Sequence, residues 1–336
     1  MRTGILACGN FIIDHVKIIS AWPEQDMLAD IRRETSSNGG GPYNILKDLA
    51  AMQVGYPLEA AGLVGDDANG QWIRRDCEAA GINTSQLSVT QEAPTSYTDA
   101  MTVEATGRRT FFHQRGANAA LIPARVQPAN SQARLFHLAY LMLLDSLDVL
   151  RADGSTGAAE LLAQARAAGL STSVDIVSTE NPQFARIAAA ALPHTDHLII
   201  NEVEAGKITG IKLNTKPVDV AAVEQCAKTL LGMGVAKQVI IHFEAGAVVA
   251  DADGSLHRQG SLQLPAGFIA GATGAGDAFA AGYLHGIHEG WPTAKRLELA
   301  VCTAAACLTH PTPSLGLRPL EQCLQLARQH GFRDLG

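Results

Sequence analysis

The 336-residue sequence lacks the features that mark nucleic-acid-binding and membrane-spanning proteins. Its 26 Lys and Arg residues are outnumbered by 33 Asp and Glu residues, so it has no basic excess with which to displace counterions from nucleic acid. No uncharged apolar run approaches the roughly 20 residues that cross a bilayer. The first ten residues are interrupted too soon for a signal peptide, and we expect them to form a buried strand that runs into a loop.

Paired cysteines are absent as well. The six cysteines lie at positions 8, 77, 226, 302, 307 and 323. None of them belongs to a C-x-x-C pair or to a clustered framework. In a chain of this size they are most simply reduced thiols, so we expect a cytoplasmic protein. A hydrophobic content of 47% and a charged content of 18% exclude extensive disorder. The length suits one large core with a small satellite domain.

Short apolar runs alternate with alanine-rich amphipathic segments over most of the chain. The runs predict strands at residues 4–8, 58–64, 135–138, 171–175, 197–200, 238–242 and 247–250. The segments predict helices at 43–52, 70–80, 157–168, 181–192, 218–233, 274–289, 293–309 and 320–329. This alternation indicates an α/β fold, a Rossmann-type three-layer sandwich with a mainly parallel central sheet. Such sheets bind their ligands at the carboxyl ends of the strands.

Two segments, 14–35 and 94–115, lack a helical period. The second alternates in polarity and contains Gly107 at a turn, as in a β-hairpin. We expect the two segments to meet in one small β-sheet that stands off the main domain. The main domain would then consist of residues 1–13, 36–93 and 116–336.

The most informative stretch is Gly271-Ala272-Thr273-Gly274-Ala275-Gly276-Asp277-Ala278-Phe279. Gly274 and Gly276 let the backbone approach an anion without interference from a Cβ. Apolar residues with helical spacing follow, so the glycines lie at a helix N-terminus, where free N–H groups and the helix dipole bind anions. Asp277, in the first turn, can reach a substrate hydroxyl beside that anion. These are the parts that phosphoryl transfer needs, although a helix-capping aspartate also explains this stretch taken alone.

Two other nucleotide-binding motifs are missing. Gly206-Lys207 is followed by Ile208 rather than by Ser or Thr, so the sequence has no Walker A loop. No G-x-G-x-x-G motif follows a predicted strand, so nicotinamide dinucleotide binding has no support.

Five landmarks, in order along the chain, resemble the PfkB/ribokinase family of carbohydrate and nucleoside kinases. Thr273–Asp277 fits the second half of the family signature D-T-x-G-A-G-D. Gly39-Gly40-Gly41-Pro42-Tyr43-Asn44 fits a Gly-Gly pair with an Asn shortly after, and Asn201-Glu202-Val203-Glu204 fits N-x-x-E. Val64–Gly70 and Gly116–Asn118 are similar to two further landmarks.

The resemblance implies a ribokinase-like fold and a role for each matching residue. It implies that Asp277 is the catalytic base and that the anion hole consists of the amides of Gly274, Ala275 and Gly276. It implies that the acceptor hydroxyls are bound by Asp14, Gly39, Gly40 and Asn44. It implies that ATP is bound by Thr273, Asn201 and Glu204, and that Mg²⁺ is held, largely through water, by Asn201 and Glu204. The two β segments would be a lid that closes over the acceptor and often mediates dimerisation.

Elementary chemistry agrees with these implied roles. A carboxylate such as Asp14 accepts from two neighbouring hydroxyls, and Asn44 offers both a donor and an acceptor. Mg²⁺ prefers oxygen ligands and keeps waters, so a sparse Asn and Glu pair suffices.

Three positions depart from the family pattern. Gly271-Ala272 replaces the usual Asp-Thr, and that Asp helps to form the monovalent-cation site of some members, so a K⁺ site is in doubt or rebuilt from backbone carbonyls. The strand that usually ends in Thr-x-Gly reads His242-Phe243-Glu244-Ala245-Gly246, which bears on nucleotide preference. Gly39-Gly40-Gly41-Pro42 replaces the Gly-Gly-Lys-Gly of ribokinases, which disfavours ribose itself.

Other polar residues have simpler explanations. His285 and His288 share a helical face but have no third ligand nearby, so a partly exposed helix face is preferred over a metal site. The Asp66-Asp67 pair suits a turn and a helix N-cap. Asp175, at a predicted strand end, fits a pocket role and a structural cap equally.

Two further sets of residues have alternatives of the same kind. Three arginines lie on or beside the small sheet, Arg108, Arg109 and Arg115. They could bind an acidic or phosphorylated acceptor, but the preferred explanation is that their charges protect an edge strand from aggregation. Asn201 and Glu204 also suit a helix cap, which is compatible with a metal role.

These observations predict an ATP-dependent, Mg²⁺-requiring kinase that phosphorylates an alcohol of a sugar or sugar-like acceptor. A nucleoside kinase of the same fold is the closer alternative. A non-catalytic sugar or nucleotide sensor is the alternative from another class. We expect the protein to bind neither nucleic acid nor a membrane. A homodimer that forms through the lid is plausible.

Overall fold

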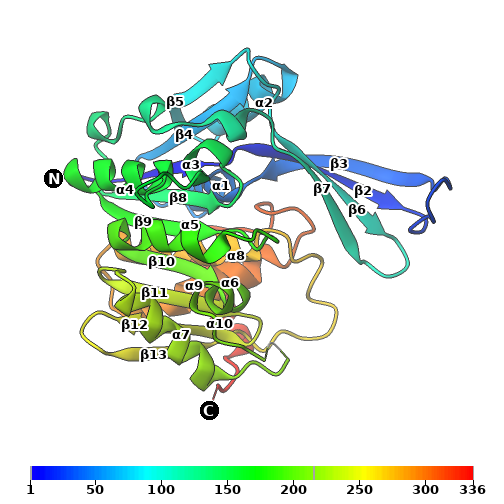
Figure 1. The fold of residues 1–336 in the computed structure, drawn as a ribbon. Coiled ribbons are helices and arrows are strands. Elements are labelled where there is room, and N and C mark those ends of the chain that lie inside the picture. Colours follow the sequence, from blue (N-terminus) through cyan, green and yellow to red (C-terminus); the bar gives the residue numbers. More distant parts are fainter. Residues whose placement is uncertain (1, 215, 336) are drawn as a thin grey trace.

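A large sheet forms the centre of the computed structural model, which describes residues 2–214 and 216–335 (Figure 1). Among these residues nine strands lie in the spatial order β13-β12-β11-β10-β9-β8-β1-β4-β5. In chain order they are β1 Ile5–Gly9, β4 Leu58–Gly65, β5 Ile82–Thr90, β8 Leu135–Leu141, β9 Ser171–Ile176, β10 His197–Asn201, β11 Gln238–Phe243, β12 Gly246–Asp251 and β13 Leu256–Gly260. Within this described sheet the neighbours are parallel except that β12 runs antiparallel to β11 and β13.

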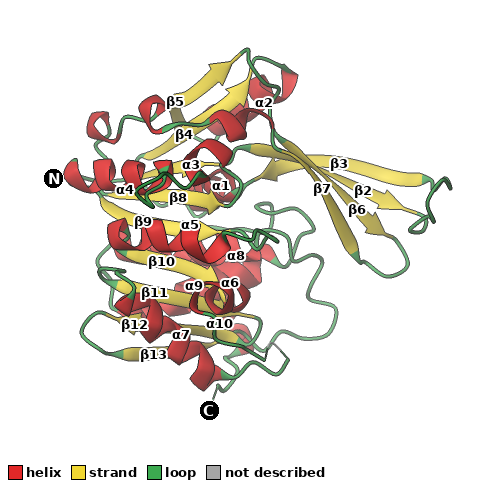
Figure 2. Ribbon diagram, in the orientation of Figure 1, coloured by secondary structure: helices red, strands yellow, loops and turns green. Residues whose placement is uncertain are grey.

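Helices cover both faces of this sheet (Figure 2). They are α1 Gly41–Ala51, α2 Ala68–Ala79, α3 Asp145–Asp148, α4 Gly157–Ala167, α5 Phe184–Ala191, α6 Glu202–Thr209, α7 Val220–Gly232, α8 Ala275–His288, α9 Thr293–Cys307 and α10 Leu320–His330. Side chains of β1 alternate between the faces: Ile5 and Ala7 belong to the apolar cluster that includes α1, α8 and α9, whereas Leu6 and Cys8 belong to the cluster that includes α4 to α7. The predicted α/β sandwich with a mainly parallel sheet is therefore confirmed.

The strands that sequence analysis does not predict are edge strands. β5 and β13 lie at the two ends of the central sheet, and they carry polar residues in place of a continuous apolar run. Helix α6 is also unpredicted, because it has only 8 residues. Helix α5 begins at Phe184, three residues later than predicted, because the Asn181 side chain accepts a hydrogen bond from the amide of Gln183 in a turn.

A second, smaller sheet stands off the main body (Figure 2). In the described part of the chain its four strands lie in the order β3-β2-β6-β7, and their bounds are β2 Ile12–Ile19, β3 Ile31–Gly39, β6 Tyr97–Val103 and β7 Arg109–Gln114. The predicted meeting of segments 14–35 and 94–115 in one sheet is confirmed by the parallel pairing of β2 with β6. β3 continues to Gly39, so this sheet, which we call the lid, leads directly into α1.

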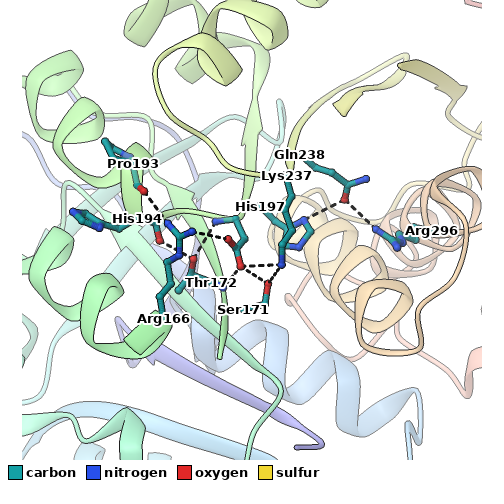
Figure 3. A network of polar contacts seen from close by, with 10 residues as sticks. Arg166, Ser171, Thr172, Pro193, His194, His197, Lys237, Gln238 and Arg296 are labelled. Atoms are coloured by element: carbon teal, nitrogen blue, oxygen red, sulfur yellow. Dashed lines mark hydrogen bonds and ion pairs between the residues drawn. The ribbon is translucent and has the colours of Figure 1, made fainter. Parts of the chain in front are cut away.

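A polar network ties together the amino ends of β9, β10 and β11, away from the carboxyl ends (Figure 3). Asp196, just before β10, accepts hydrogen bonds from Ser171 at 2.5 Å and from the Lys237 ammonium at 3.1 Å. Burial alone would raise the pKa of Asp196, but these two hydrogen bonds lower it below its usual value. The network thus joins the three strands to one another at their amino ends.

Two findings concern the classes that the sequence excludes. Among the described residues no helix combines the length and the apolar character that crossing a membrane requires. All six cysteines are free thiols, as predicted, and all six are buried.

Candidate active site

A cavity of about 500 Å³ lies at the carboxyl ends of the central strands, the edge at which parallel sheets bind ligands. Its lining combines strand ends, a helix N-terminus and part of the lid, including Asp175, Asn201, His242, residues 272–277, Arg109 and Phe111. The site predicted from the glycine-rich stretch therefore also includes residues that lie far from that stretch in the sequence.

The glycine-rich stretch begins helix α8, as the sequence predicts. Gly274 is the N-cap and has a left-handed backbone with φ of 80°. A Cβ on Gly274 would lie 2.6 Å from the Cβ of Pro313, so this position requires glycine. The first intrahelical hydrogen bond runs from the amide of Ala278 to the carbonyl of Gly274 at 2.8 Å. The preceding amides, those of residues 275–277, are therefore available to an anion, which the helix dipole also favours.

Asp277 lies in the first turn of α8 and is only 3% exposed. Both carboxylate oxygens accept hydrogen bonds, Oδ1 from the Tyr140 phenol at 2.5 Å and Oδ2 from the Asn44 amide at 2.7 Å. Burial raises the pKa of Asp277 to about 6, although the hydrogen bonds from Asn44 and Tyr140 act to lower it. A carboxylate with this pKa is mostly ionised at neutral pH and is still basic enough to take a proton from an alcohol.

No sequence motif singles out Tyr140, which lies in β8, 137 positions before its partner Asp277. Its ring packs on the start of α1, because a Cβ on Gly41 would lie 2.8 Å from the Tyr140 Cε1 atom. Gly41, the third glycine of the Gly39-Gly40-Gly41 run, is thus the local sequence feature that indicates a bulky side chain packed against the start of α1.

The predicted acceptor-side residues lie where the lid joins the main domain. Asp14 of β2 lies against Gly39 of β3, where a Cβ would approach the Asp14 carboxyl carbon to 2.5 Å. Gly40 has φ of 86°, and a Cβ there would lie 2.2 Å from the Asn10 carbonyl oxygen. Burial and the negative charge of Asp277 raise the pKa of Asp14 to about 7. The structure therefore brings Asp14 and both glycines together beside Asp277.

Asn44, in the first turn of α1, belongs to a chain of side-chain hydrogen bonds. The Asn38 amide donates to the Asn44 Oδ1 atom at 2.7 Å and to the Ser314 hydroxyl at 2.9 Å. Since Asn44 in turn donates to Asp277, its orientation is fixed from both sides. Asn44 thus links the lid strand β3 to the candidate base.

Asn201 and Glu204 form a capping box at the start of α6, so the predicted helix cap is confirmed. The Asn201 side chain accepts from the Glu204 amide, and the Glu204 side chain accepts from the Asn201 amide, both at 2.9 Å. Burial raises the pKa of Glu204 to about 7. Asp175 lies nearby at the end of β9, and burial followed by the negative charge of Glu204 raises its pKa well above the usual value. Asp175 is also part of the cavity lining, which favours the pocket role over a cap alone.

A second cavity, of about 420 Å³, adjoins the first. The two share His242, Ala272, Ala275 and Gly276 in their linings. Apolar side chains such as Phe279 and Ile269 dominate the second cavity, with the carboxylates of Glu202 and Glu244 among its lining. A flat apolar group that carries polar substituents would fit this cavity with an anionic chain reaching into the first.

Thr273, just before the N-cap, is held from two directions. The Arg109 guanidinium donates to the Thr273 hydroxyl. The Cys307 thiol donates to the Thr273 carbonyl at 3.3 Å and to the Pro313 carbonyl at 2.9 Å. Cys307 thus joins the loop before α8 to the loop after α9.

Two minor predictions have opposite outcomes. Asp67 is the N-cap of α2 and accepts from the Gly70 amide, as predicted. The partly exposed helix face predicted for His285 and His288 is wrong. Both are buried, and the Tyr56 ring stacks on each of them, with centroids 5.8 Å and 3.7 Å away. His288 also accepts a hydrogen bond from the Gly4 amide at 2.8 Å, so the pair belongs to the core.

The three arginines near the lid behave differently from one another. Arg115 pairs with Asp145 at 2.6 Å, and Arg108 is exposed. Arg109 instead reaches Thr273 and lines the cavity, so the preferred explanation as edge-strand charge does not hold for it. The contact spans 164 positions in sequence, and no local pattern reveals it.

Comparisons with known proteins add to this geometry. A model of the pfkB family of carbohydrate kinases matches residues 3–318 of the chain. The 5-dehydro-2-deoxygluconokinase of Shouchella clausii is 21% identical over 332 residues, which cover 97% of this chain and 95% of that protein. The ATP-dependent ribose-1-phosphate kinase of Halopiger xanaduensis is 30% identical over 122 residues, which cover 36% of this chain and 40% of that protein.

The structure of Arabidopsis thaliana ribokinase complexed with ribose and ATP superposes with a TM-score of 0.77 at 21% identity. The match covers 97% of this chain and 99% of that one. At this identity the likeness establishes a shared ribokinase fold.

Proposed function

The chain belongs to the pfkB family of carbohydrate kinases, and we propose that it transfers the γ-phosphoryl group of ATP to a hydroxyl of a sugar or sugar-like acceptor. The observation that carries this proposal is the place of Asp277. Its buried carboxylate lies next to the free amides of residues 275–277 and in the lining of the cavity. ATP as the donor is supported by the shared fold with Arabidopsis thaliana ribokinase, which was solved with ribose and ATP.

In the proposed reaction Asp277 takes the proton of the acceptor hydroxyl while the hydroxyl oxygen forms a bond to the γ-phosphorus. The bond from that phosphorus to the β–γ bridging oxygen breaks, and ADP leaves with the electron pair. The amides of residues 275–277 stabilise the charge on the transferred group. Asp14 and Asn44 hydrogen-bond the other acceptor hydroxyls, and Gly39 and Gly40 keep the backbone close to them.

Magnesium fits the oxygen-rich side of the cavity. We assign it to Asn201 and Glu204 together with the ATP phosphates, largely through water, as Mg²⁺ prefers. Asp175 and Glu204 are two buried carboxylates whose negative charges lie close enough to raise a pKa, so a cation there relieves their repulsion. When bound, the metal supplies positive charge for the phosphate oxygens.

A K⁺ site at the same position as in other family members does not fit this chain. A Cβ on Gly271 would lie 2.6 Å from the Cα of Pro311, so a ligating side chain has no room there. The Cys307 thiol already donates to the Thr273 and Pro313 carbonyls. We therefore expect activity that does not depend on K⁺.

The apolar cavity is the proposed place of the ATP base. Its wall contains Phe279, and Glu202 and Glu244 can accept from ribose hydroxyls or from a base amino group. Both cavities are lined by Ala275 and Gly276, and Thr273 lines the first. A polyphosphate that extends from the apolar cavity toward Asp277 would therefore contact these three residues.

The lid is the proposed dimer interface. The side chains of Trp22 and Phe112 are 51% and 50% exposed, yet their rings stack on one another with centroids 6.0 Å apart. Large apolar groups that remain exposed together mark a surface that another molecule covers. A second copy of the lid would bury them.

The first test is ADP release from ATP and Mg²⁺ across a panel of sugars, sugar acids, sugar phosphates and nucleosides. Replacement of Asp277 by Asn removes the base but keeps the shape of the side chain. We expect kcat to fall by roughly 10²- to 10⁴-fold, while the circular dichroism spectrum and ATP binding stay close to those of the wild type. Turnover of Asp277→Asn near the wild-type rate would refute Asp277 as the base.

The same panel separates the alternatives. Turnover of adenosine, inosine or guanosine above that of every sugar would make the protein a nucleoside kinase. Melting shifts with sugars and ATP but without ADP release would favour a sensor. Parallel assays with and without K⁺ should give equal rates, and a strict K⁺ requirement would contradict the structural argument from Gly271.

A further inference from the structure

A separate cavity of about 560 Å³ lies at the amino ends of the central strands, the opposite edge of the sheet from the candidate active site. Such a volume suits a small molecule. The first residues of β8, β9, β10 and β11 and the last residue of β12 line it, namely Leu135, Ser171, His197, Gln238 and Asp251. The network of Figure 3 therefore forms part of its wall. Among the described residues it shares no lining with the two active-site cavities.

Three cationic side chains line this cavity, those of Arg134, Lys237 and Arg296. Both guanidinium groups donate to backbone carbonyls, that of Arg134 at 2.5 Å and that of Arg296 at 2.6 Å. Within the described part of the chain neither arginine has a carboxylate partner, whereas Lys237 is paired with Asp196 at 3.1 Å. A carbonyl leaves the charge of a guanidinium uncompensated, so both arginines can still pair with an anion.

Helix α9 begins at the wall of the same cavity, with Thr293. Its N-cap is Pro292, and the amides of Lys295 and Arg296 donate to the Pro292 carbonyl at 3.0 Å and 3.1 Å. The amides of Thr293 and Ala294 come before these and have no intrahelical partner. The positive end of the helix dipole therefore adds to the charge of the two arginines.

His197 supplies a buried hydrogen-bond acceptor to the wall of this cavity. It is only 4% exposed, and its Nδ1 atom lies 3.1 Å from Oε1 of Gln238. The Arg296 guanidinium donates to the same Oε1 atom at 3.0 Å, so that atom is an acceptor and Nδ1 carries the proton. Burial lowers the pKa of His197 to about 3, so the ring is neutral. Its Nε2 atom keeps a lone pair and has no partner among the described residues, which leaves it available to a hydroxyl of a ligand.

Two carboxylates restrict the kind of anion that fits this cavity. Asp251 and Asp253 belong to its lining. Asp251 accepts from the Gln238 amide at 2.5 Å and lies 2.8 Å from Nε2 of His257, while Asp253 accepts from the Ser255 amide at 2.9 Å. A carboxylate repels a second anionic group but accepts from hydroxyls. The three cations and two carboxylates therefore favour a ligand with one anionic group and several hydroxyls over a polyanion.

From this wall we propose that the cavity is a second ligand site, which binds a small phosphate ester that carries several hydroxyls. The phosphate would pair with Arg134 and Arg296 beside the start of α9, since a planar guanidinium donates to two phosphate oxygens at once. The hydroxyls would donate to His197 and to the two carboxylates. This site goes beyond the proposed kinase function, because that reaction uses the carboxyl ends of the strands.

Helix α8 separates this cavity from the active site. The helix begins with the anion-binding amides at Ala275, and Ile287 near its end lines the second ligand site. Its 14 residues span about 20 Å at 1.5 Å per residue. A phosphate ester in this cavity is therefore too far from Asp277 to be a product held in the active site, and the two positions can be told apart by experiment.

The test is isothermal titration of the full chain with ribose 5-phosphate, in the presence and absence of saturating AMP-PNP and Mg²⁺, which fill the active site. We expect binding that persists with AMP-PNP, weaker binding of inorganic phosphate and no binding of ribose. Arg296→Gln should weaken the binding of ribose 5-phosphate by about tenfold or more, because a charge-assisted hydrogen bond is lost. Lys295→Gln is the matched control, since Lys295 is the adjacent exposed cation and lies outside the lining. Its affinity should equal that of the wild type.

Four results would overturn the proposal. Binding that AMP-PNP abolishes would place the ligand in the active site. Equal affinities for inorganic phosphate and ribose 5-phosphate would remove the role of the hydroxyls, and equal affinities of Arg296→Gln and Lys295→Gln would remove the role of Arg296. A wild type that binds ribose 5-phosphate neither in the titration nor in a melting assay would refute the site itself. Should Arg296→Gln fail to fold, Arg134→Gln gives the same comparison, because the Arg134 side chain is exposed.

Discussion

Asp277 is held by two side chains that come from distant elements, Tyr140 of β8 and Asn44 of α1. A hydrogen bond to a charged group contributes about 1.5–3 kcal/mol, so the two donors together offset much of the cost of burying the carboxylate. Burial nevertheless prevails, since the pKa of Asp277 stays above its usual value of 3.8, at about 6. The result is a base that is oriented, largely ionised at neutral pH and still basic.

Replacement of Tyr140 by Phe should move the pH dependence of the reaction. The Tyr140 hydrogen bond lowers the pKa of Asp277, so its loss raises that pKa. Activity requires the ionised carboxylate, hence the acidic limb of kcat/KM against pH should shift to higher pH and kcat at neutral pH should fall. Other titratable groups act on or near this site, namely Asp14, Asp48, Asp175 and Cys307. The wild type and the variant are therefore compared over the whole limb.

Tyr283→Phe is the matched control for this prediction. Tyr283 is a second buried tyrosine, and its hydroxyl donates to Gln238 at 3.2 Å, at the amino end of β11. Its loss should leave the acidic limb in place. A limb that does not move in Tyr140→Phe, or that moves equally in both variants, would show that the phenol does not act on Asp277.

At the level of elements, the junction of β3 with α1 determines the acceptor side of the site. The strand ends at Gly39 and the helix begins at Gly41, so one residue, Gly40, turns the chain with φ of 86°. Pro42 at the helix start suits this position because its missing N–H has no intrahelical partner in any case. The sharp turn allows Asp14 from the lid and Asn44 from α1 to approach the same region.

Gly39→Ala should weaken acceptor binding through this junction. The new Cβ would lie 2.5 Å from the Asp14 carboxyl carbon, so that side chain must move. We expect the acceptor KM to rise by about tenfold or more, about 1.4 kcal/mol in binding, while the affinity for ATP stays unchanged. Steady-state kinetics with either substrate varied would check this.

Gly232→Ala is the control, since a Cβ at the end of α7 has no atom of the described residues within 4 Å. Its kinetics should match those of the wild type. An unchanged acceptor KM in Gly39→Ala would mean that Asp14 does not contact the acceptor.

In the whole molecule the lid stands off the main body (Figure 1), and its side chains Trp22 and Phe112 remain exposed. Sedimentation velocity should detect a dimer of the wild type. The double replacement Trp22→Ser and Phe112→Ser should shift it to a monomer, because the stacked apolar pair supplies the area that the partner would bury.

Leu315→Ser is the control for this experiment. Leu315 is also a large exposed apolar residue, but it lies outside the lid, in the loop between α9 and α10. Its replacement should leave the dimer intact. A monomeric wild type, or a dimer that survives the double replacement, would exclude the lid interface.

The sequence alone determined the class of fold and the place of the chemistry. Strands and helices follow from local periodicity and from the residues that start and stop them, so the central elements were predicted to within a few residues. The start of α8 was equally predictable, because Gly274, Gly276 and Asp277 act through the backbone of their own turn. The capping box of Asn201 and Glu204 is local for the same reason.

Only the tertiary structure decided which side chains share the site with Asp277. Tyr140 and Arg109 meet their partners across 137 and 164 positions, and such contacts depend on the order of strands in the sheets and on the direction of the lid. His285 and His288, predicted to lie partly exposed, are buried, and Tyr56 of the loop between α1 and β4 stacks on both. Local propensity carries no information about which elements pack together, since packing depends on how all the buried surfaces of the chain fit at once.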